Sequence, residues 1–370
     1  MTPAELSRTV LRSVRGAVEE QELSVAVPAR IVVQPPPRPG CGDYASNVAL
    51  QLAQQAGRPA REVAEILRKR LSGSAGIARV EIAGPGFLNF TLGDGAQVAL
   101  VREVLARGDG YGGGPAAGQS PVAADLATDP AADPVAAPAT APAAHPTTAP
   151  ASNARAAVVA EALARIDAAA GPGGRGVADE QPVLVPAPYD LAALIARLGV
   201  DEARWVLLRP AAQDPVRVPE RPVQRESNPR FRVQYAYARA RALGRHAREL
   251  GFGSEPGDVG APVRGRVADD GSSDGAGSAA QALKSFHTLL ATYPSVVESA
   301  ARLRAPDRVV RHLEATADAF FRWHDVYPPL PVGEQKPLAV HRARLALAEA
   351  GRTVLANGLR LLGISAPEHL

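Results

Sequence analysis

One helical stretch carries side chains that could hold a nucleic-acid backbone. From Pro229 to Arg248, polar and basic residues recur at steps of four and three, which places them on one helix face. They are Arg230, Gln234, Tyr237, Arg241, Arg245 and Arg248. Guanidinium groups bind phosphate and stack on bases, so this stripe with its interleaved tyrosine predicts a phosphate track. The alternative is a solvated helix face, which is what most charge stripes are.

The residues around this stripe support a helix in a basic environment. Asn228 and Pro229 are typical of a helix start. A second face of the same helix carries Phe231, Tyr235, Ala238 and Ala242. From residue 197 to residue 249 there are twelve arginines and six acidic residues. Such an excess would attract a polyanion in a salt-dependent way.

A second candidate contact follows a Gly84-Pro85-Gly86 turn. Residues 87–92 alternate in polarity, which predicts a strand with Leu88, Phe90 and Leu92 toward a core. Phe87 and Asn89 then face outward. An exposed aromatic ring can stack on an RNA base while an amide two residues away hydrogen-bonds the base edge. The alternative is that Phe87 covers the end of the sheet and Asn89 caps a turn.

The elements that must position these residues predict a multidomain protein, part α+β and part all-α. Helices beside a small sheet indicate an α+β domain over 1–108. Recurrent prolines among Ala, Thr, Gly and Asp predict a disordered Ala/Pro-rich linker over 109–151. One short helix and an apolar run, read as a strand at Val183–Val185, fill 152–185. A helical bundle is expected over 186–370, interrupted by a flexible insertion at 251–280.

Composition excludes several classes of protein. The chain has 370 residues and a net charge of +3, and its only cysteine is Cys41, which fits a reducing cytoplasm. No run of 18 apolar residues predicts a membrane span. The seven histidines show no paired spacing typical of a metal site. The sequence therefore predicts a cytoplasmic protein with no metal ligands and no membrane partner.

Both ends of the chain resemble arginyl-tRNA synthetases. Gly42-Asp43-Tyr44-Ala45-Ser46-Asn47 and the segment from Val80 to Phe90 resemble that family's additional N-terminal domain. Val233-Gln234-Tyr235-Ala236-Tyr237-Ala238-Arg239 and a closing helix at 341–362 resemble its anticodon-binding (DALR) bundle. We expect the closing helix to stop at Gly363 and to turn five apolar residues inward, namely Leu345, Ala348, Leu355, Leu359 and Leu362. The resemblance implies that Phe87 and Asn89 read a base of the tRNA D-loop. It also implies anticodon contacts at Tyr235, Tyr237, Arg239 and Leu370.

Two departures from the family pattern weaken the expected base specificity. His324-Asp325 stands where the family carries an aromatic–amide pair, and Leu370 stands where it carries a terminal methionine. Trp323 is a candidate substitute for stacking, against the simpler interpretation as a core residue.

The sequence lacks the signature motifs of the family's catalytic core. The positions of its ATP-binding His-x-Gly-His signature are Pro150, Ala151, Ser152 and Asn153, and no lysine stands where its Lys-rich loop would lie, near 183–188. Only 16 residues separate Ile166 from Val183, about half of one of the βαβ units that a nucleotide-binding fold requires. No residue is therefore assigned to catalysis, and ATP would be a cofactor only if ligase activity survives.

These observations predict a tRNA-binding paralogue of arginyl-tRNA synthetase that lacks aminoacylation activity and acts as a carrier or regulator of arginine tRNA. One alternative is arginine–tRNA ligase activity, alone or in trans with a full-length synthetase. Another is a scaffold whose bundle binds protein. The expected partners are an arginine tRNA and either a full-length synthetase or an enzyme that uses arginyl-tRNA.

Overall fold

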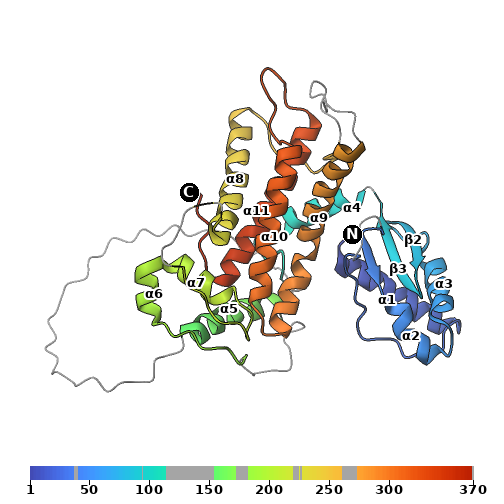
Figure 1. Cartoon of the computed structure of the whole chain (residues 1–370). Helices are drawn as coiled ribbons and strands as arrows, with labels where there is room; N and C mark the ends of the chain where they lie inside the picture. Colours follow the sequence, from blue (N-terminus) through green and yellow to red (C-terminus); the bar gives the residue numbers. More distant parts are fainter. Residues whose placement is uncertain are drawn as a thin grey trace, which may run out of the picture.

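The computed structural model describes residues 1–36, 41–93, 95–113, 154–171, 182–219, 225, 227–260 and 273–368. Within these residues the elements follow in the order α1 (Pro3–Glu19), β1 (Tyr44–Ser46), α2 (Val48–Ala56), α3 (Ala60–Leu71), β2 (Ile77–Ala83), β3 (Phe87–Leu92), α4 (Gly95–Arg107), η1 (Gly108–Gly110), α5 (Ala154–Ala170), α6 (Leu191–Leu198), α7 (Val200–Leu208), α8 (Pro229–Glu249), α9 (Ser273–Arg302), α10 (Asp307–Val326) and α11 (Ala339–Leu362). The expected order of a small α+β region followed by a helical bundle is confirmed (Figure 1).

The N-terminal region is a three-stranded antiparallel sheet covered by helices α1, α2 and α3 (Figure 1). The strand order is β1-β3-β2, so β3 is the central strand. Helix α1 begins with a capping box in which Thr2 and Glu5 bond each other's backbone N–H. Its apolar face meets Leu88 and Phe90 of β3 in one core, because every second residue of a strand points to the same side.

Helix α4 packs into the bundle core, although it falls within the α+β domain predicted over 1–108. Leu100, Val101 and Val104 belong to the same buried cluster as the bundle helices. Beyond α4, the Tyr111 hydroxyl donates to the Leu290 carbonyl at 2.9 Å. Gly112 has a φ of +97°, and a Cβ there would lie 2.3 Å from the Tyr293 ring, so this close crossing requires glycine.

Two ion pairs connect the N-terminal region to α9. The Lys284 ammonium donates to the Gly42 carbonyl at 2.7 Å and lies 3.0 Å from the Asp43 carboxylate. Arg30 donates from its two terminal guanidinium nitrogens, Nη1 and Nη2, to the two carboxylate oxygens of Glu298, at 2.7 and 3.2 Å. Figure 1 shows the sheet domain beside this edge of the bundle. The two lobes therefore have a defined polar contact in addition to the chain that joins them.

The bundle is built around α11, which lies among α8, α9 and α10 (Figure 1). Helix α11 ends at Gly363, which adopts the left-handed conformation expected of a helix stop. The inward positions predicted for this helix, namely Leu345, Ala348, Leu355, Leu359 and Leu362, are all buried. Trp323 is also fully buried and stacks on Phe286, so it is a core residue and not a stacking surface for RNA.

One buried arginine ties α5 to the segment that follows α7. The Arg155 guanidinium donates to five backbone carbonyls at 2.7–3.3 Å, which belong to Val185, Pro210, Ala211, Ala212 and Asp214. Burial lowers the pKa of this guanidinium from its usual value. The strand predicted at Val183–Val185 does not form: this segment is irregular, with a single backbone bond from Val185 N–H to the Ala212 carbonyl. An isolated apolar run gains strand geometry only from a neighbouring strand, and none lies beside it in the described chain.

The predicted flexible insertion at 251–280 is partly ordered. Phe252 and Val259 are buried, Glu255 N–H bonds the Arg342 carbonyl, and Arg344 donates to the Val259 carbonyl. Helix α9 already begins at Ser273. Most of the predicted linker, including 114–151, lies outside the described residues. No helix in the described parts of the chain is long and apolar enough to cross a membrane.

Candidate nucleic-acid interface

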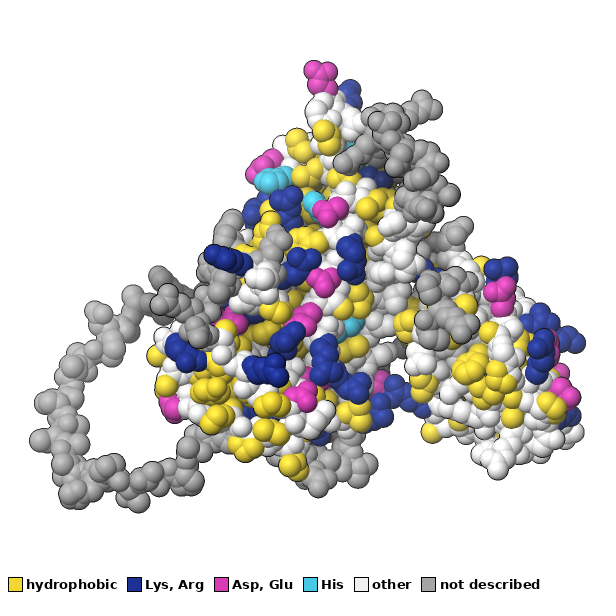
Figure 2. Space-filling view, viewed as in Figure 1, with side chains coloured by type: hydrophobic (Ala, Val, Ile, Leu, Met, Phe, Trp, Pro, Cys, Tyr) yellow, Lys and Arg dark blue, Asp and Glu magenta, His cyan; other side chains and the backbone are white. Residues whose placement is uncertain are grey.

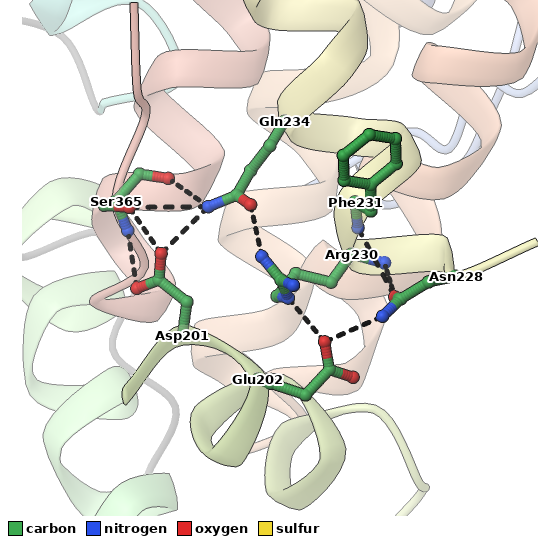
Figure 3. Close-up of polar contacts among 7 residues, drawn as sticks. All are labelled: Asp201, Glu202, Asn228, Arg230, Phe231, Gln234 and Ser365. Atoms are coloured by element: carbon green, nitrogen blue, oxygen red, sulfur yellow. Dashed lines mark hydrogen bonds and ion pairs between the residues drawn. The ribbon is translucent and has the colours of Figure 1, made fainter. Parts of the chain in front are cut away.

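The first turn of α8 is fixed by an internal polar network (Figure 3). Asn228 caps the helix as predicted, because its side-chain oxygen accepts from the N–H groups of Arg230 and Phe231. The Glu202 carboxylate of α7 accepts from Asn228 at 2.8 Å and from Arg230 at 2.5 Å. Arg230 also donates to Gln234. Arg230 is therefore committed to a largely buried ion pair, not presented to solvent as the stripe predicted.

Gln234 lies at the centre of the same network. Its amide nitrogen donates to the Asp201 carboxylate and to the Ser365 carbonyl, both at 2.9 Å (Figure 3). The Ser365 hydroxyl and N–H donate to Asp201 as well. Gln234 is only 1% exposed. The prediction of an outward Gln234 is wrong, because α7 and the segment after α11 both cover this side of α8.

The second half of the helix is more open. Tyr237 is buried, which contradicts its predicted place on an exposed stripe, whereas Arg239 and Arg248 are exposed. Arg241 is half-buried and donates to the Glu368 carboxylate. Arg245 is also half-buried, and its Nη1 has no hydrogen-bond partner. The basic character of α8 is thus concentrated from Arg239 onward, on the last three turns.

An aromatic ladder runs between α8 and α10. Phe231 stacks on Tyr235 with ring centroids 6.0 Å apart, and Tyr235 stacks on Phe321 at 5.5 Å. All three rings are partly exposed. The Arg232 guanidinium lies 4.9 Å from the Phe321 ring centroid and pairs with Asp318 at 2.5 Å. Partly exposed rings beside a guanidinium are suited to stacking on unpaired bases.

On α10, the His324 ring lies beside the Phe320 ring, with ring centroids 5.8 Å apart. Burial, together with the neighbouring Arg239 charge, holds the pKa of His324 below its ordinary value. The charged imidazolium form of His324 is thus disfavoured at this position. Figure 2 shows basic side chains spread over the bundle with hydrophobic ones between them.

Of the two candidate residues in the N-terminal domain, Phe87 is exposed and Asn89 is buried. Phe87 is 40% exposed and is the only exposed aromatic side chain among the described residues. Asn89 is only 8% exposed, so its predicted outward, accessible position is wrong: it lies mid-strand between β1 and β2. Gly86, before Phe87, touches the Ala60 backbone, where a Cβ would lie 2.9 Å from the Ala60 carbonyl oxygen. Phe87 therefore lies near the start of α3, where Arg58 and Arg61 are exposed.

Several predicted positions lie outside the described residues, namely Pro150, Ala151, Ser152, Asn153 and Leu370. The helical pattern of α8 did not indicate Arg232 and Phe321 as candidate site residues. Their contact joins two helices that are about ninety residues apart in sequence, so no local pattern reveals it. No group of three or more metal-ligating side chains occurs within the described ranges.

Known proteins similar to this chain are arginine–tRNA ligases. The one from Frankia alni is 27% identical over 582 aligned positions and is matched over the whole of both chains. More than a third of those positions are gaps here, because this chain has 370 residues. Those from Paenarthrobacter aurescens and Pseudarthrobacter chlorophenolicus are each 41% identical. Each of these two alignments covers 49% of this chain but only 30% and 31% of the ligase.

Comparisons of fold and domain agree with the sequence matches. The arginyl-tRNA synthetase of Thermus thermophilus superposes with a TM-score of 0.60 over the whole of both chains at 14% identity, which shows a shared fold. The family model for the arginyl tRNA synthetase N terminal domain matches residues 8–92. The model for the DALR anticodon binding domain matches residues 233–370. The protein is therefore an arginyl-tRNA synthetase-like chain, in which two separate regions match the N-terminal and DALR domain models of that family.

Proposed function

We propose that this protein binds tRNA through two separate surfaces and does not itself attach the amino acid. The surface on the bundle comprises the aromatic ladder of Phe231, Tyr235 and Phe321 and the arginines from Arg239 onward. The surface on the N-terminal domain is centred on Phe87. The observation that carries the proposal is that α8 carries exposed Arg239 and Arg248 on the same helix as Tyr235, whose partly exposed ring stacks on Phe321 within the DALR-matched region. Such surfaces hold unpaired bases by stacking and phosphates by charge.

The Phe87→Ala variant tests the N-terminal surface. We expect the Kd for an arginine tRNA transcript to rise about 10-fold, since stacking of one base on an aromatic ring contributes roughly 1–3 kcal/mol. Filter binding at fixed salt measures the change. Val32→Ala is a matched control, because Val32 is exposed on the same domain. An equal loss in both variants, or no loss for Phe87→Ala, contradicts a role for this ring.

The sequence between the two domains supports the proposed lack of aminoacylation activity. The α5 segment follows Pro150-Ala151-Ser152-Asn153, where the family has its histidine signature, and no lysine precedes α6 in the run 183–188. Without a cation, charge that develops on a transferring phosphate is not neutralised. We interpret 109–151 as a linker and 152–185 as the remnant of the core, between an N-terminal domain at 1–108 and a bundle at 186–370. A carrier or regulator of arginine tRNA fits this organisation.

Arginine–tRNA ligase activity is the second candidate, because the Frankia alni ligase matches the chain from end to end. Arginine-dependent exchange of pyrophosphate into ATP, with tRNA present, separates the two. We expect no exchange above a blank for the purified chain, and none added when it is mixed with limiting full-length synthetase. If the pyrophosphate-exchange activity co-purifies with this chain through two unrelated columns, the chain has arginine–tRNA ligase activity.

A protein-binding scaffold makes a different prediction. If the bundle binds protein, a partner should remain attached after ribonuclease treatment. If it binds tRNA, the co-purifying material should be RNA, and sequencing that RNA identifies the species.

A further inference from the structure

The segment after α11 lies along the basic side of α8. Ser365 contacts Gln234 and Asp201, and Glu368 contacts Arg241. The two contacts are three residues apart in this segment and seven residues apart on α8. Three extended residues span about 10 Å and seven helical residues rise about 10.5 Å. The segment therefore runs parallel to α8 for two turns, in the direction of Arg245 and Arg248. We call residues 363–368 the tail.

The two contacts of the tail differ in strength. Ser365 is held by hydrogen bonds from its hydroxyl and its N–H to Asp201 and by one from Gln234 to its carbonyl, next to the buried Gln234 side chain (Figure 3). The Glu368 side chain is 56% exposed, and the Arg241 side chain is 28% exposed. An exposed ion pair contributes little, because water and salt screen it. The tail is therefore held by hydrogen bonds with Asp201 and Gln234 at Ser365 and by one exposed ion pair at Glu368.

A carboxylate on Arg241 occupies the place that a phosphate would take. Both anions accept two parallel N–H bonds from a guanidinium group, so they compete for the same edge of the side chain. Arg241 lies between the exposed Arg239 and the half-buried Arg245, within the basic part of α8. A phosphate backbone that follows this part of the helix would therefore meet Glu368.

We propose that the tail is an intramolecular competitor for RNA, in which Glu368 neutralises Arg241 in the free protein and is displaced by a phosphate. Ser365 keeps its contacts with Asp201 and Gln234, and only the Glu368 side chain leaves Arg241. This inference rests on the proposed tRNA binding and adds a control to it. Because one carboxylate is exchanged for one phosphate, the competitor lowers the affinity for every RNA that uses Arg241. It also lowers by about one the number of counterions released on RNA binding, and so makes the dependence of log Kd on log salt shallower.

The decisive variant is Glu368→Gln, assayed in the full chain with an arginine tRNA transcript. We expect the Kd at low salt to fall about 2- to 5-fold and the slope of log Kd against log salt to steepen by about 1. Glu103→Gln is the matched control: it removes the same charge from an ion pair with Arg107 on α4. The control should leave both quantities close to those of the parent protein.

A double variant distinguishes competition from general electrostatics. Arg241→Gln should weaken binding, and adding Glu368→Gln to it should have no further effect, because the residue that Glu368 blocks is absent. If Glu368→Gln alone leaves the affinity for the transcript unchanged or lowers it, the competitor hypothesis is wrong. The proposed tRNA binding is not affected by that result. If no variant and no parent protein retains the transcript at low salt, the proposed function falls and the competitor falls with it. Equal melting temperatures of all variants confirm that the fold is unaffected.

Discussion

The Arg155→Met variant is expected to lose about 3 kcal/mol of unfolding free energy, since a buried acceptor left without its donor costs roughly 1–3 kcal/mol. Methionine retains much of the apolar stem but donates nothing, and five carbonyls from two segments would lose their shared partner. Water can replace some of these bonds, because residues 210–214 are partly exposed. That replacement is why the expected loss is well below the sum over five carbonyls.

Urea unfolding followed by circular dichroism measures this loss. Arg165→Met is the matched control on the same helix, where the side chain is 41% exposed and its guanidinium pairs with Glu161 at 3.6 Å. The control should change stability by well under 1 kcal/mol, as exposed ion pairs do. A loss as small for Arg155→Met would mean that the segment after α7 is held by its apolar contacts and not by the arginine.

The triple variant of Arg239, Arg241 and Arg245 to Gln is expected to weaken tRNA binding about 100-fold at low salt. The slope of log Kd against log salt should become shallower by about 2 to 3, because each guanidinium that contacts a phosphate releases about one counterion. The aromatic ladder is untouched by these changes, so residual binding should depend weakly on salt. Fluorescence anisotropy at several salt concentrations gives both quantities.

A charge-matched control separates a local interface from net charge. Arg12, Arg15 and Arg102 are exposed on α1 and α4, so their triple replacement by Gln changes the total charge equally. If it weakens binding as much as the α8 variant, the RNA is attracted by the charge of the whole chain and the α8 surface is not the site.

The sequence predictions for the bundle helices succeeded where they depended on neighbouring residues. The cap at Asn228 depends on the side chain and backbone of neighbouring residues, and so does the stop at Gly363. The inward leucines of α11 followed from helical period alone. The two recognisable domains carried motifs that the family models also match.

The prediction failed where burial was decided by distant segments. Gln234 and Tyr237 share the period of Arg241 and Arg245, yet the first two are buried and the last two are partly open. Asp201 and Ser365, which close over Gln234, lie 33 and 131 residues away in sequence. Likewise Asn89 looked accessible from strand alternation but is the middle of a central strand. Alternation specifies which side of an element a residue occupies, and not what covers that side.

The sequence by itself determined the bundle helices, the helix cap at Asn228 and the resemblance to arginyl-tRNA synthetases, because these depend on neighbouring residues and on motifs with fixed spacing. The tertiary structure decided which arginines remain available on α8. A guanidinium is available only if no carboxylate reaches it first, and Glu202 and Glu368 reach Arg230 and Arg241 only through the packing of α7 and the tail against α8. Period places a charge on a helix face, whereas folding determines which opposite charge lies within reach of it.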